Sequence, residues 1–501
     1  MHRRTAGLIM VACLTACATS PGVISTEARS GNATATTAVV GNTPPDTSPD
    51  TSPATVPDTV PDGSSPDPDG IGDALFPSLG NPGIDVEHYN LVMNYDPLRN
   101  DLSAQAHLEL VMTEDRPSFT LDSDGPEVSA VTVDGAPATF VAESPELRIT
   151  PAGPLTKGQH LVVDVTYTLS PHPVPSAAGQ QVGWFPTPGG SYVLDEPEGA
   201  HTWMPCDDHP SDKATYRFEI TVPAGLTAVA NGAMVSHTST VSTETWVWQE
   251  DRPMATYLIQ LLTGDYEIVD GVGPNGLPLV SVVLHDDRAT MQPYLDVIAD
   301  QIDYFDDFFG PYPLDRYGIA ITDSFPGLAM ETMERSLFSR ADFASGRLEP
   351  AQQLFLSHEL AHQWFGDAVT PALWSDVWLN ESFATYGEWM WLDHLGVQPI
   401  EQAASAGLAA REHRATADPT AAEMFDFNSY DGGAVVLHAL RKTIGDDLFF
   451  NLLRRWAGDN NGQSRTTEDF VALANEVAGK DLTDFFATWL YADTVPTTFP
   501  V

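Results

Sequence analysis

From residue 84 onward, the chain shows two successive patterns of hydrophobic residues. From residue 84 to about residue 270, apolar residues alternate with polar ones or gather in short β-rich runs, and the turn pairs Asp134-Gly135 and Asn231-Gly232 separate some of them. The clearest runs are HLELVMT, ELRIT, QHLVVDVTYTL, TYRFEITV, ETWVWQ and MATYLIQLLTG. Alternation gives each strand one buried face, so the pattern predicts an antiparallel β domain over residues 84–270.

The second pattern begins after one more apolar strand at residues 279–284. The segment MQPYLDVIADQIDYFDDFFG repeats its apolar residues at helical spacing and stops at Gly310-Pro311. Later helical segments are AQQLFLSHELAHQWFGD, LNESFATYGEWMWLDHLG, GAVVLHALRKTIG, DLFFNLLRRWAG and TEDFVALANEVAG. We therefore predict a multidomain α+β fold, in which a mainly helical domain over residues 271–501 follows the β domain. A chain of 501 residues also exceeds what one hydrophobic core usually serves.

The start of the chain has the features of an export signal. A basic stretch, HRR, precedes an apolar run at residues 6–16 that is too short to cross a bilayer as a permanent helix. The run ends in LTAC, which resembles the lipobox of bacterial lipoproteins. The resemblance implies a lipoprotein signal peptide at residues 1–17 and acylation of Cys17, which would anchor the protein to a bacterial cell membrane outside the cytoplasm. An ordinary secretory signal cut nearby is the alternative.

Residues 18–83 are predicted to be a disordered linker. They are rich in Thr, Pro, Ser, Asp and Gly and contain few large apolar residues, so they cannot bury enough surface to fold. No second apolar segment is long enough to cross a membrane, so we expect membrane contact through the lipid anchor alone.

Composition narrows the classes of partner. The chain has 23 Lys plus Arg against 69 Asp plus Glu, which gives a formal net charge of -46. Such a surface repels phosphate backbones, so we expect no nucleic-acid partner. Behind the predicted signal, Cys206 is the one cysteine in the sequence. Neither an internal disulfide nor a cysteine cluster for zinc is therefore expected.

A metal-binding motif stands out in the helical part. Residues 358–362, HELAH, form an H-E-x-x-H motif, and residues four apart on a helix share one face. Both His358 and His362 can then reach one ion, while Glu359 faces its open position. Glu381 follows in a second predicted helix, and two His with one Glu leave zinc a free position for water. We expect a catalytic Zn²⁺ with Glu359 as the base, whereas two unrelated surface histidines are the alternative reading of the motif alone.

The stretch HELAHQWFGDAVTPALWSDVWLNESFATYGE resembles the aminopeptidase N and leukotriene hydrolase family of gluzincins. Further stretches are similar to other parts of that family and follow its order. They are AHTWMPCDDHPSDKATYRFEITVP, FFGPYPLDRYGIAITDSFPGLAMET, SYDGGAVVLHALR and TEDFVALANEVAGKDLTDFFATWL. The resemblance covers about residues 85–495 and implies a thermolysin-like zinc-peptidase domain behind the β domain.

The resemblance also implies roles for three further residues. Glu331 matches the acid that binds the free α-amino group of the substrate, with a solvated turn acid as the alternative. Glu196 falls where the family often has a second amine-binding acid, with an ordinary surface acid as the alternative. Tyr430 matches the tyrosine that stabilises the oxyanion, with an ordinary tyrosine before a helix as the alternative.

The sequence departs from the family at two motifs. Residues 328–332 read LAMET where the family has G-A-M-E-N, and residues 431–433 read DGG where it usually has x-Lys-Gly. The resemblance implies that the Gly and Asn of G-A-M-E-N help hold the substrate backbone, so the first departure bears on substrate geometry. Because the sequence stops near the last predicted helices, we also expect an open cleft that admits longer substrates.

These residues together predict a zinc-dependent aminopeptidase that removes N-terminal residues from peptide substrates outside the cytoplasmic membrane. A thermolysin-like endopeptidase is the first alternative, and Glu331 argues against it. A non-catalytic surface-binding protein is the second, and the complete set of expected catalytic groups argues against that.

Overall fold

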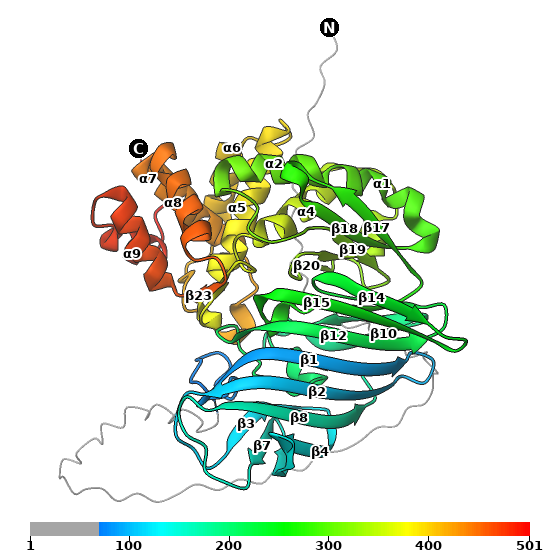
Figure 1. Ribbon diagram of the computed structural model, residues 1–501. Helices are drawn as coiled ribbons and strands as arrows, with labels where there is room; N and C mark the ends of the chain where they lie inside the picture. The colour runs from blue at the N-terminus through cyan, green and yellow to red at the C-terminus, as the bar shows by residue number, and fades with distance from the viewer. Residues whose placement is uncertain (1–69, 501) are drawn as a thin grey trace, which may run out of the picture. The chain divides into compact units, whose positions relative to one another are not determined.

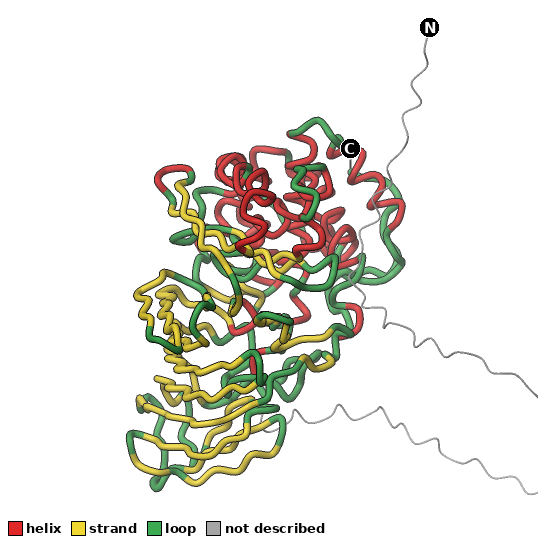
Figure 2. The backbone as a smooth tube through the Cα atoms, turned by 90° about the vertical axis from the view of Figure 1, so that its right-hand side faces the viewer, coloured by secondary structure: helices red, strands yellow, loops and turns green. Residues whose placement is uncertain are grey.

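The computed structural model describes residues 70–500, which are drawn in colour in Figure 1. The predicted signal peptide, the acylation site Cys17 and the predicted linker up to residue 69 lie outside the described residues. Along the described part, strands come first and helices predominate from residue 288 onward. Figure 2 shows the helices, in red, gathered on one side of the strands.

An eight-stranded sheet dominates the N-terminal part, in the order β14-β15-β12-β1-β2-β8-β4-β5. Its neighbours are antiparallel except β1 and β12, which run parallel and pair Leu91 with Phe218. The predicted alternation of buried and exposed residues is clear in β1, β2 and β12. The strands are β1 Ile84–Asp96, β2 Asp101–Met112, β4 Glu127–Val133, β5 Ala136–Pro137, β8 His160–Leu169, β12 Lys213–Pro223, β14 Ala233–Ser239 and β15 Thr243–Ala255.

Two smaller sheets complete this part, in the orders β13-β16-β11-β10-β9 and β3-β7-β6. Their strands are β3 Phe119–Asp122, β6 Thr139–Glu143, β7 Glu146–Thr150, β9 Pro173–Pro175, β10 Gln181–Thr187, β11 Gly190–Leu194, β13 Thr227–Ala230 and β16 Leu261–Gly264. All five residues of β11 are buried. Because β11 ends two residues before Glu196, this buried strand fixes the position of the Glu196 backbone.

Residues 70–83 pack on the folded part, so the prediction of a disordered linker is wrong for this stretch. Phe76 and Leu79 are buried in the core, and the Phe76 ring meets the Trp374 ring edge-on at 6.3 Å between centroids. The Asp73 carboxylate accepts backbone hydrogen bonds from Leu75 at 2.7 Å and Trp374 at 2.8 Å. Two large apolar residues and one buried acid thus anchor this stretch, which is rich in Gly and Pro.

A five-stranded sheet opens the second part, in the order β17-β18-β19-β21-β20. Its strands are β17 Tyr266–Val272, β18 Pro278–Leu284, β19 Ile319–Thr322, β20 Ala329–Met330 and β21 Ser336–Ser339. The sequence pattern predicted the strand at residues 279–284 and none of the later ones, because β19 and β21 are four residues long, fully buried and without a period. The predicted domain division after residue 270 falls inside β17, whose partner β18 belongs to this sheet.

Ten α-helices follow or accompany this sheet in the described part of the chain. They are α1 Arg288–Asp296, α2 Ile298–Phe309, α3 Arg340–Phe343, α4 Pro350–His362, α5 Trp378–His394, α6 Ile400–Ala410, α7 Gly433–Ile444, α8 Asp446–Asp459, α9 Thr467–Ala478 and α10 Thr483–Trp489. The first fifteen residues of α5 are buried, so this helix runs through the core and packs on α4. A short parallel pair, β22 Val369–Pro371 with β23 Gln463–Arg465, ties α4 to the later helices. Within residues 70–500, no helix has the length and apolar character to cross a membrane.

Candidate metal centre and active site

Two core helices bring three metal-binding side chains together. α4 carries His358 and His362 one turn apart, and α5 carries Glu381 in its first turn. The two Nε2 atoms are 3.1 Å apart, and Glu381 Oε2 lies 3.3 Å from His358 Nε2 and 3.5 Å from His362 Nε2. The three residues are 8 %, 1 % and 2 % exposed, so the cluster is nearly closed to solvent.

The spacing of these atoms fits one zinc ion. Zinc binds imidazole nitrogen and carboxylate oxygen at about 2.0–2.2 Å, and tetrahedral geometry then separates neighbouring ligand atoms by about 3.3–3.6 Å. The two separations from Glu381, 3.3 and 3.5 Å, fall within this range, and the 3.1 Å between the two Nε2 atoms lies slightly below it. Three protein ligands leave the fourth position open, which is the arrangement of catalytic rather than structural zinc.

Further contacts hold both imidazoles in the orientation that zinc needs. His358 Nδ1 lies 2.6 Å from Glu388 Oε1, and His362 Nδ1 lies 3.0 Å from the carbonyl oxygen of Phe365. Each histidine therefore directs its Nδ1–H away from the cluster and presents Nε2 to the metal. The sequence-based prediction missed Glu388. Its signal was present, since Glu388 follows Glu381 by two helical turns and so lies on the same face of α5.

Glu359 lies on α4 beside the first ligand and is 5 % exposed. Burial raises the pKa of its carboxyl to about 8, against the opposing effect of the two neighbouring imidazoles. The Ser336 hydroxyl of β21 donates to the Glu359 carbonyl oxygen at 3.3 Å, which fixes this turn of α4 against the sheet. A carboxylate in this position beside the metal ligands can accept a proton and later return it.

Glu331 directly follows β20 and points into the same buried space. It is 2 % exposed, and its Oε1 lies 4.0 Å from His362 Nδ1. Burial raises the pKa of the Glu331 carboxyl. Gln363, the residue after the second histidine, donates from Nε2 to the Glu331 carbonyl oxygen at 3.0 Å and accepts from the Glu334 N–H at 2.8 Å. The carboxamide thus links the Glu331 segment to the metal-binding helix.

Glu196 reaches the site from the β-rich part of the chain. It is 8 % exposed, and Glu196, Glu331 and Glu381 each place a carboxylate oxygen within 4.8 Å of the other two. Burial, followed by the charge of Glu331, raises the pKa of Glu196 well above its ordinary value. Glu196 is therefore buried beside the metal ligands, whereas the sequence also allowed it to be an ordinary surface acid.

Tyr430 lies in a π-helical turn, η7 (Asn428–Gly432), immediately before α7. Its ring stacks on the His358 ring with 5.9 Å between centroids and an interplanar angle of 19°. The Ser382 hydroxyl of α5 donates to the Ser429 carbonyl oxygen at 2.6 Å and holds this turn against the metal site. Burial raises the pKa of the Tyr430 phenol well above its ordinary value, so the hydroxyl stays protonated and can donate.

Similarity to known proteins agrees with this geometry. Residues 85–258 match the Peptidase M1 N-terminal domain, and residues 294–489 match the Peptidase family M1 domain. A crystal structure of an M1 zinc metallopeptidase from Deinococcus radiodurans matches with a TM-score of 0.78 at 32 % identity, over 86 % of this chain and 100 % of that one. The chain belongs to the M1 family of zinc metallopeptidases.

A second solved structure and a curated M1 relative differ in how much of them the chain covers. A mutant M1 zinc metallopeptidase from Deinococcus radiodurans, bound to a Tyr-Ser-Ala substrate, has a TM-score of 0.76 at 30 % identity, over 86 % of this chain and 99 % of that one. Aminopeptidase M1-C of Oryza sativa subsp. japonica is 29 % identical over 319 residues, which are 58 % of this chain and 35 % of that protein. The match thus spans about a third of this curated relative.

Membership of the M1 family confirms two predictions made from the sequence. The fold class is α+β, with a β-rich N-terminal domain followed by a mainly helical catalytic domain. The cofactor of this family is zinc, and the ligand spacing described above fits it.

Hydrogen bonds join the two M1 domains directly behind the metal site. The Tyr257 hydroxyl donates to the Gly366 carbonyl oxygen at 3.2 Å and accepts from Asn380 Nδ2 at 3.2 Å. Lys213 of β12 donates from Nζ to the Asp367 carbonyl oxygen at 3.0 Å, and burial lowers the pKa of its ammonium to about 7. These contacts fix the β domain against the residues between α4 and α5, and so fix Glu196 relative to the metal ligands.

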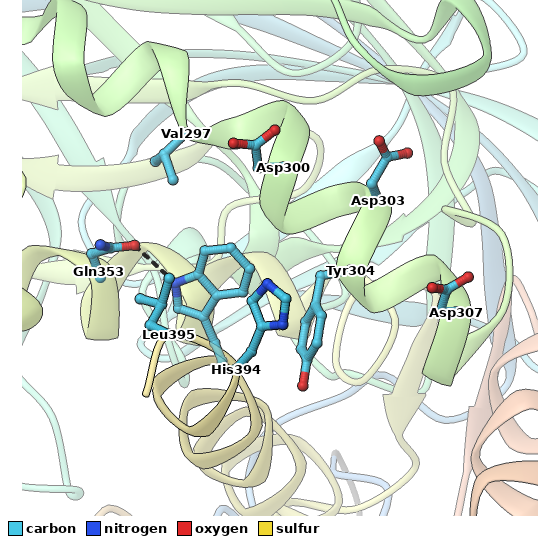
Figure 3. Close-up of a pocket in the computed structure, with 9 residues that line it drawn as sticks. Val297, Asp300, Asp303, Tyr304, Asp307, Gln353, His394 and Leu395 are labelled. Carbon is cyan, nitrogen blue, oxygen red and sulfur yellow. Dashed lines mark hydrogen bonds between the residues drawn. The ribbon is translucent and has the colours of Figure 1, made fainter. Parts of the chain in front are cut away.

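A separate surface hollow of about 430 Å³ lies between α2 and the end of α5, and it contains none of the site residues (Figure 3). Asp300, Asp303 and Asp307 project from α2 at its rim, beside Tyr304 and His394. The Trp391 indole donates to Gln353 Oε1 at 2.9 Å, and the Tyr304 and His394 rings are 4.5 Å apart. Its acids are exposed, unlike those of the metal site.

Proposed function

We propose that this chain is a zinc-dependent aminopeptidase that removes N-terminal residues from peptides outside the cytoplasmic membrane. The observation that carries the proposal is the pair of buried carboxylates, Glu331 and Glu196, which two different domains bring beside the metal ligands. A buried carboxylate pair attracts an ammonium group, and a peptide has such a group at its free end. The Tyr-Ser-Ala substrate of the related Deinococcus radiodurans protein supports peptides as the substrate class.

Each residue of the site has a role in such a reaction. Zinc held by His358, His362 and Glu381 would act as a Lewis acid that polarises the scissile carbonyl and lowers the pKa of water. Glu359 would take the proton of the attacking water and pass it to the leaving amine. Tyr430 would donate a hydrogen bond to the carbonyl oxygen as it gains negative charge.

The carboxylate pair determines which bond is cut. When Glu331 and Glu196 hold the α-ammonium, the first peptide bond is the one that reaches the metal and Glu359. Internal bonds have no ammonium at that distance and gain nothing from the pair. Exopeptidase action therefore depends on these two acids rather than on the metal.

A panel of matched substrates tests the proposal. Aminoacyl p-nitroanilides and peptides with a free amine should be hydrolysed, their N-acetylated counterparts should react at least about 100-fold more slowly, and a chelator should abolish both activities. If free and acetylated peptides are cut equally well, the enzyme is an endopeptidase and the amine-binding role is wrong. If neither is cut by zinc-loaded protein, the non-catalytic alternative holds.

The extracytoplasmic location rests on the sequence of the signal, which lies outside the described residues. The position of Cys17 at the end of the apolar run supports acylation of this residue. The linker and the two M1 domains follow Cys17 in the chain. Labelled fatty acid fed to expressing bacteria should enter the wild-type chain and should be absent from Cys17→Ala. Label that persists in Cys17→Ala would show that the lipobox reading is wrong.

A further inference from the structure

Glu196, Glu331 and Glu381 form a second group of possible metal ligands beside the predicted zinc site. Their carboxylate oxygens all lie within 4.8 Å of one another, and the residues are 8 %, 2 % and 2 % exposed. Glu381 belongs to both groups, so its carboxylate could be shared between two ions. Carboxylates shared in this way are common where two metal ions lie about 3.5–4 Å apart.

Zinc alone does not neutralise the charge of this region. The two charges of Zn²⁺ are matched by Glu381 and by Glu388, which contacts His358. Glu196, Glu331 and Glu359 then remain without a cation. Among residues 70–500, no lysine or arginine forms an ion pair with Glu196 or Glu331. A further divalent cation would give these acids an oppositely charged partner.

Two oxygen atoms in the group also lack partners. Oε1 of Glu196 and Oε1 of Glu331 are both buried and accept no hydrogen bond. A buried acceptor without a partner destabilises the folded state, and more so when it is charged. Under the proposed function, the ammonium of a substrate meets both oxygens, but only while a substrate is bound. Between turnovers the same oxygens are available to another cation.

We propose that Glu196, Glu331 and Glu381 bind a second divalent cation in the substrate-free protein, and that this ion competes with the substrate ammonium. Three carboxylates without imidazole or thiolate form a ligand set that suits hard cations such as Mg²⁺, Ca²⁺ and Mn²⁺. The ion site stands on the geometry alone, whereas the competition rests on the proposed function. Divalent ions outside the cell would then act as competitive inhibitors of peptides with a free amine.

Manganese is a suitable probe because unbound Mn²⁺ gives an electron paramagnetic resonance signal that binding broadens. Zinc ranks above manganese in the general order of affinity, so Mn²⁺ should leave the zinc of the loaded protein in place. High ionic strength screens the exposed acids of this protein and suppresses unspecific binding. Zinc-loaded wild type should then bind one Mn²⁺ per chain, with the zinc content unchanged.

Two comparisons test where that ion binds. Glu196→Gln replaces the carboxylate by an amide of similar shape. The affinity for Mn²⁺ should fall by more than about 10- to 100-fold, which is the loss expected when a residue that only contacts a metal ligand is changed. Asp303→Asn removes an exposed acid from the separate hollow and should change nothing. L-Leucinol, which has an ammonium but no bond to cut, should displace Mn²⁺ from wild type, whereas N-acetyl-L-leucinol should not.

The outcomes separate the two parts of the proposal. Mn²⁺ binding that is absent in wild type, or equal in wild type and Glu196→Gln, overturns the second ion site. Binding that Glu196→Gln abolishes but L-leucinol leaves intact supports the ion site and overturns the competition. The comparison of free and acetylated peptides tests the aminopeptidase function separately, so failure of one is distinguishable from failure of the other.

Discussion

Glu331 presents a buried carboxylate to the metal site, and its removal should affect one class of substrate. A charged hydrogen bond to a partly desolvated ammonium is worth about 2–4 kcal/mol. Glu331→Ala should therefore lower kcat/KM for peptides with a free amine by about 30- to 1000-fold. N-acetylated peptides should lose little more, since they never made the contact. Equal losses for both substrate classes in steady-state assays would contradict an amine-binding role.

Glu359 is the residue whose removal should stop the chemistry without disturbing the metal. Glutamine has the same shape but cannot accept the proton of the attacking water, so Glu359→Gln should lower kcat by at least about 100-fold. Zinc content, measured by mass spectrometry, should stay near that of wild type because Glu359 is not a ligand. Near-normal turnover in this variant would mean that another group is the base.

Some residues of this site could be predicted from the sequence and others could not. The difference lies in how far apart in the chain the contacting residues are. His358, His362 and Glu359 follow from helical spacing, because their geometry is local. Gln363 has no such signal. Its role depends on a segment about thirty residues earlier, and nothing in the sequence between them marks that contact.

The segment between β20 and β21 is an element held in place by one side chain of α4. Gln363 bonds to it at both Glu331 and Glu334, and each neutral hydrogen bond is worth about 0.5–1.5 kcal/mol. Gln363→Ala should free the segment and lower kcat/KM for free-amine peptides by about 10-fold, with most of the loss in KM. Acetylated peptides and zinc content serve as controls. An unchanged ratio between free and acetylated peptides would show that Gln363 does not position Glu331.

The same segment meets β15 through two acids, and this contact predicts a dependence of stability on pH. Burial, followed by the charge of Glu334, raises the pKa of Glu250 to about 9, although Arg316 lies 3.8 Å away. Between the ordinary pKa of a glutamate and about pH 9, Glu250 is therefore protonated in the folded protein and ionised in the unfolded chain. Stability from this proton is present at low pH and is lost as the pH rises towards about 9.

Glu250→Gln keeps the shape of the protonated acid at every pH. Its thermal midpoint should therefore rise relative to that of wild type between pH 6 and pH 9, as measured by differential scanning fluorimetry, because unfolding of wild type releases a proton and unfolding of the variant does not. Glu219→Gln, on the exposed side of the neighbouring β12, should show no such trend. A gain that is constant over this range would mean that Glu250 is already ionised at pH 6.

At the scale of elements, the sequence predicted what repeats over several residues. The long strands β1, β2 and β12 alternate, and helices α1, α2, α4, α5 and α7 to α9 have recognisable spacing, whereas α3, α6 and α10 were not predicted. The missed strands β19 and β21 are short and buried on both faces, so they have no polar side to mark a period. The parallel pairing of β1 with β12 was also missed, because the two strands are more than a hundred residues apart and pairing direction leaves no local trace.

The whole molecule concentrates negative charge at one buried point, and zinc offsets part of it. Glu196, Glu331 and Glu381 place carboxylate oxygens within 4.8 Å of one another, and Glu331 and Glu359 form a similar group with His362. A ligand that binds the folded state alone raises its stability, so a chelator should lower the thermal midpoint by several degrees and added zinc should restore it. Glu381→Ala, which cannot hold zinc tightly, should be insensitive to the chelator. An equal shift in that variant would show that the chelator acts elsewhere.

The burial of residues 70–83 bears on how this protein is best produced. A gene shortened to begin at Ile84, where the first strand starts, would remove Phe76 and Leu79 from the core and expose the apolar side chains that they cover to solvent. It would also take away the acceptor for the Trp374 N–H, close to the start of α5. A recombinant product that begins before Gly70 keeps these contacts, whereas one that begins at Ile84 should aggregate on purification and give a poor yield for crystallisation.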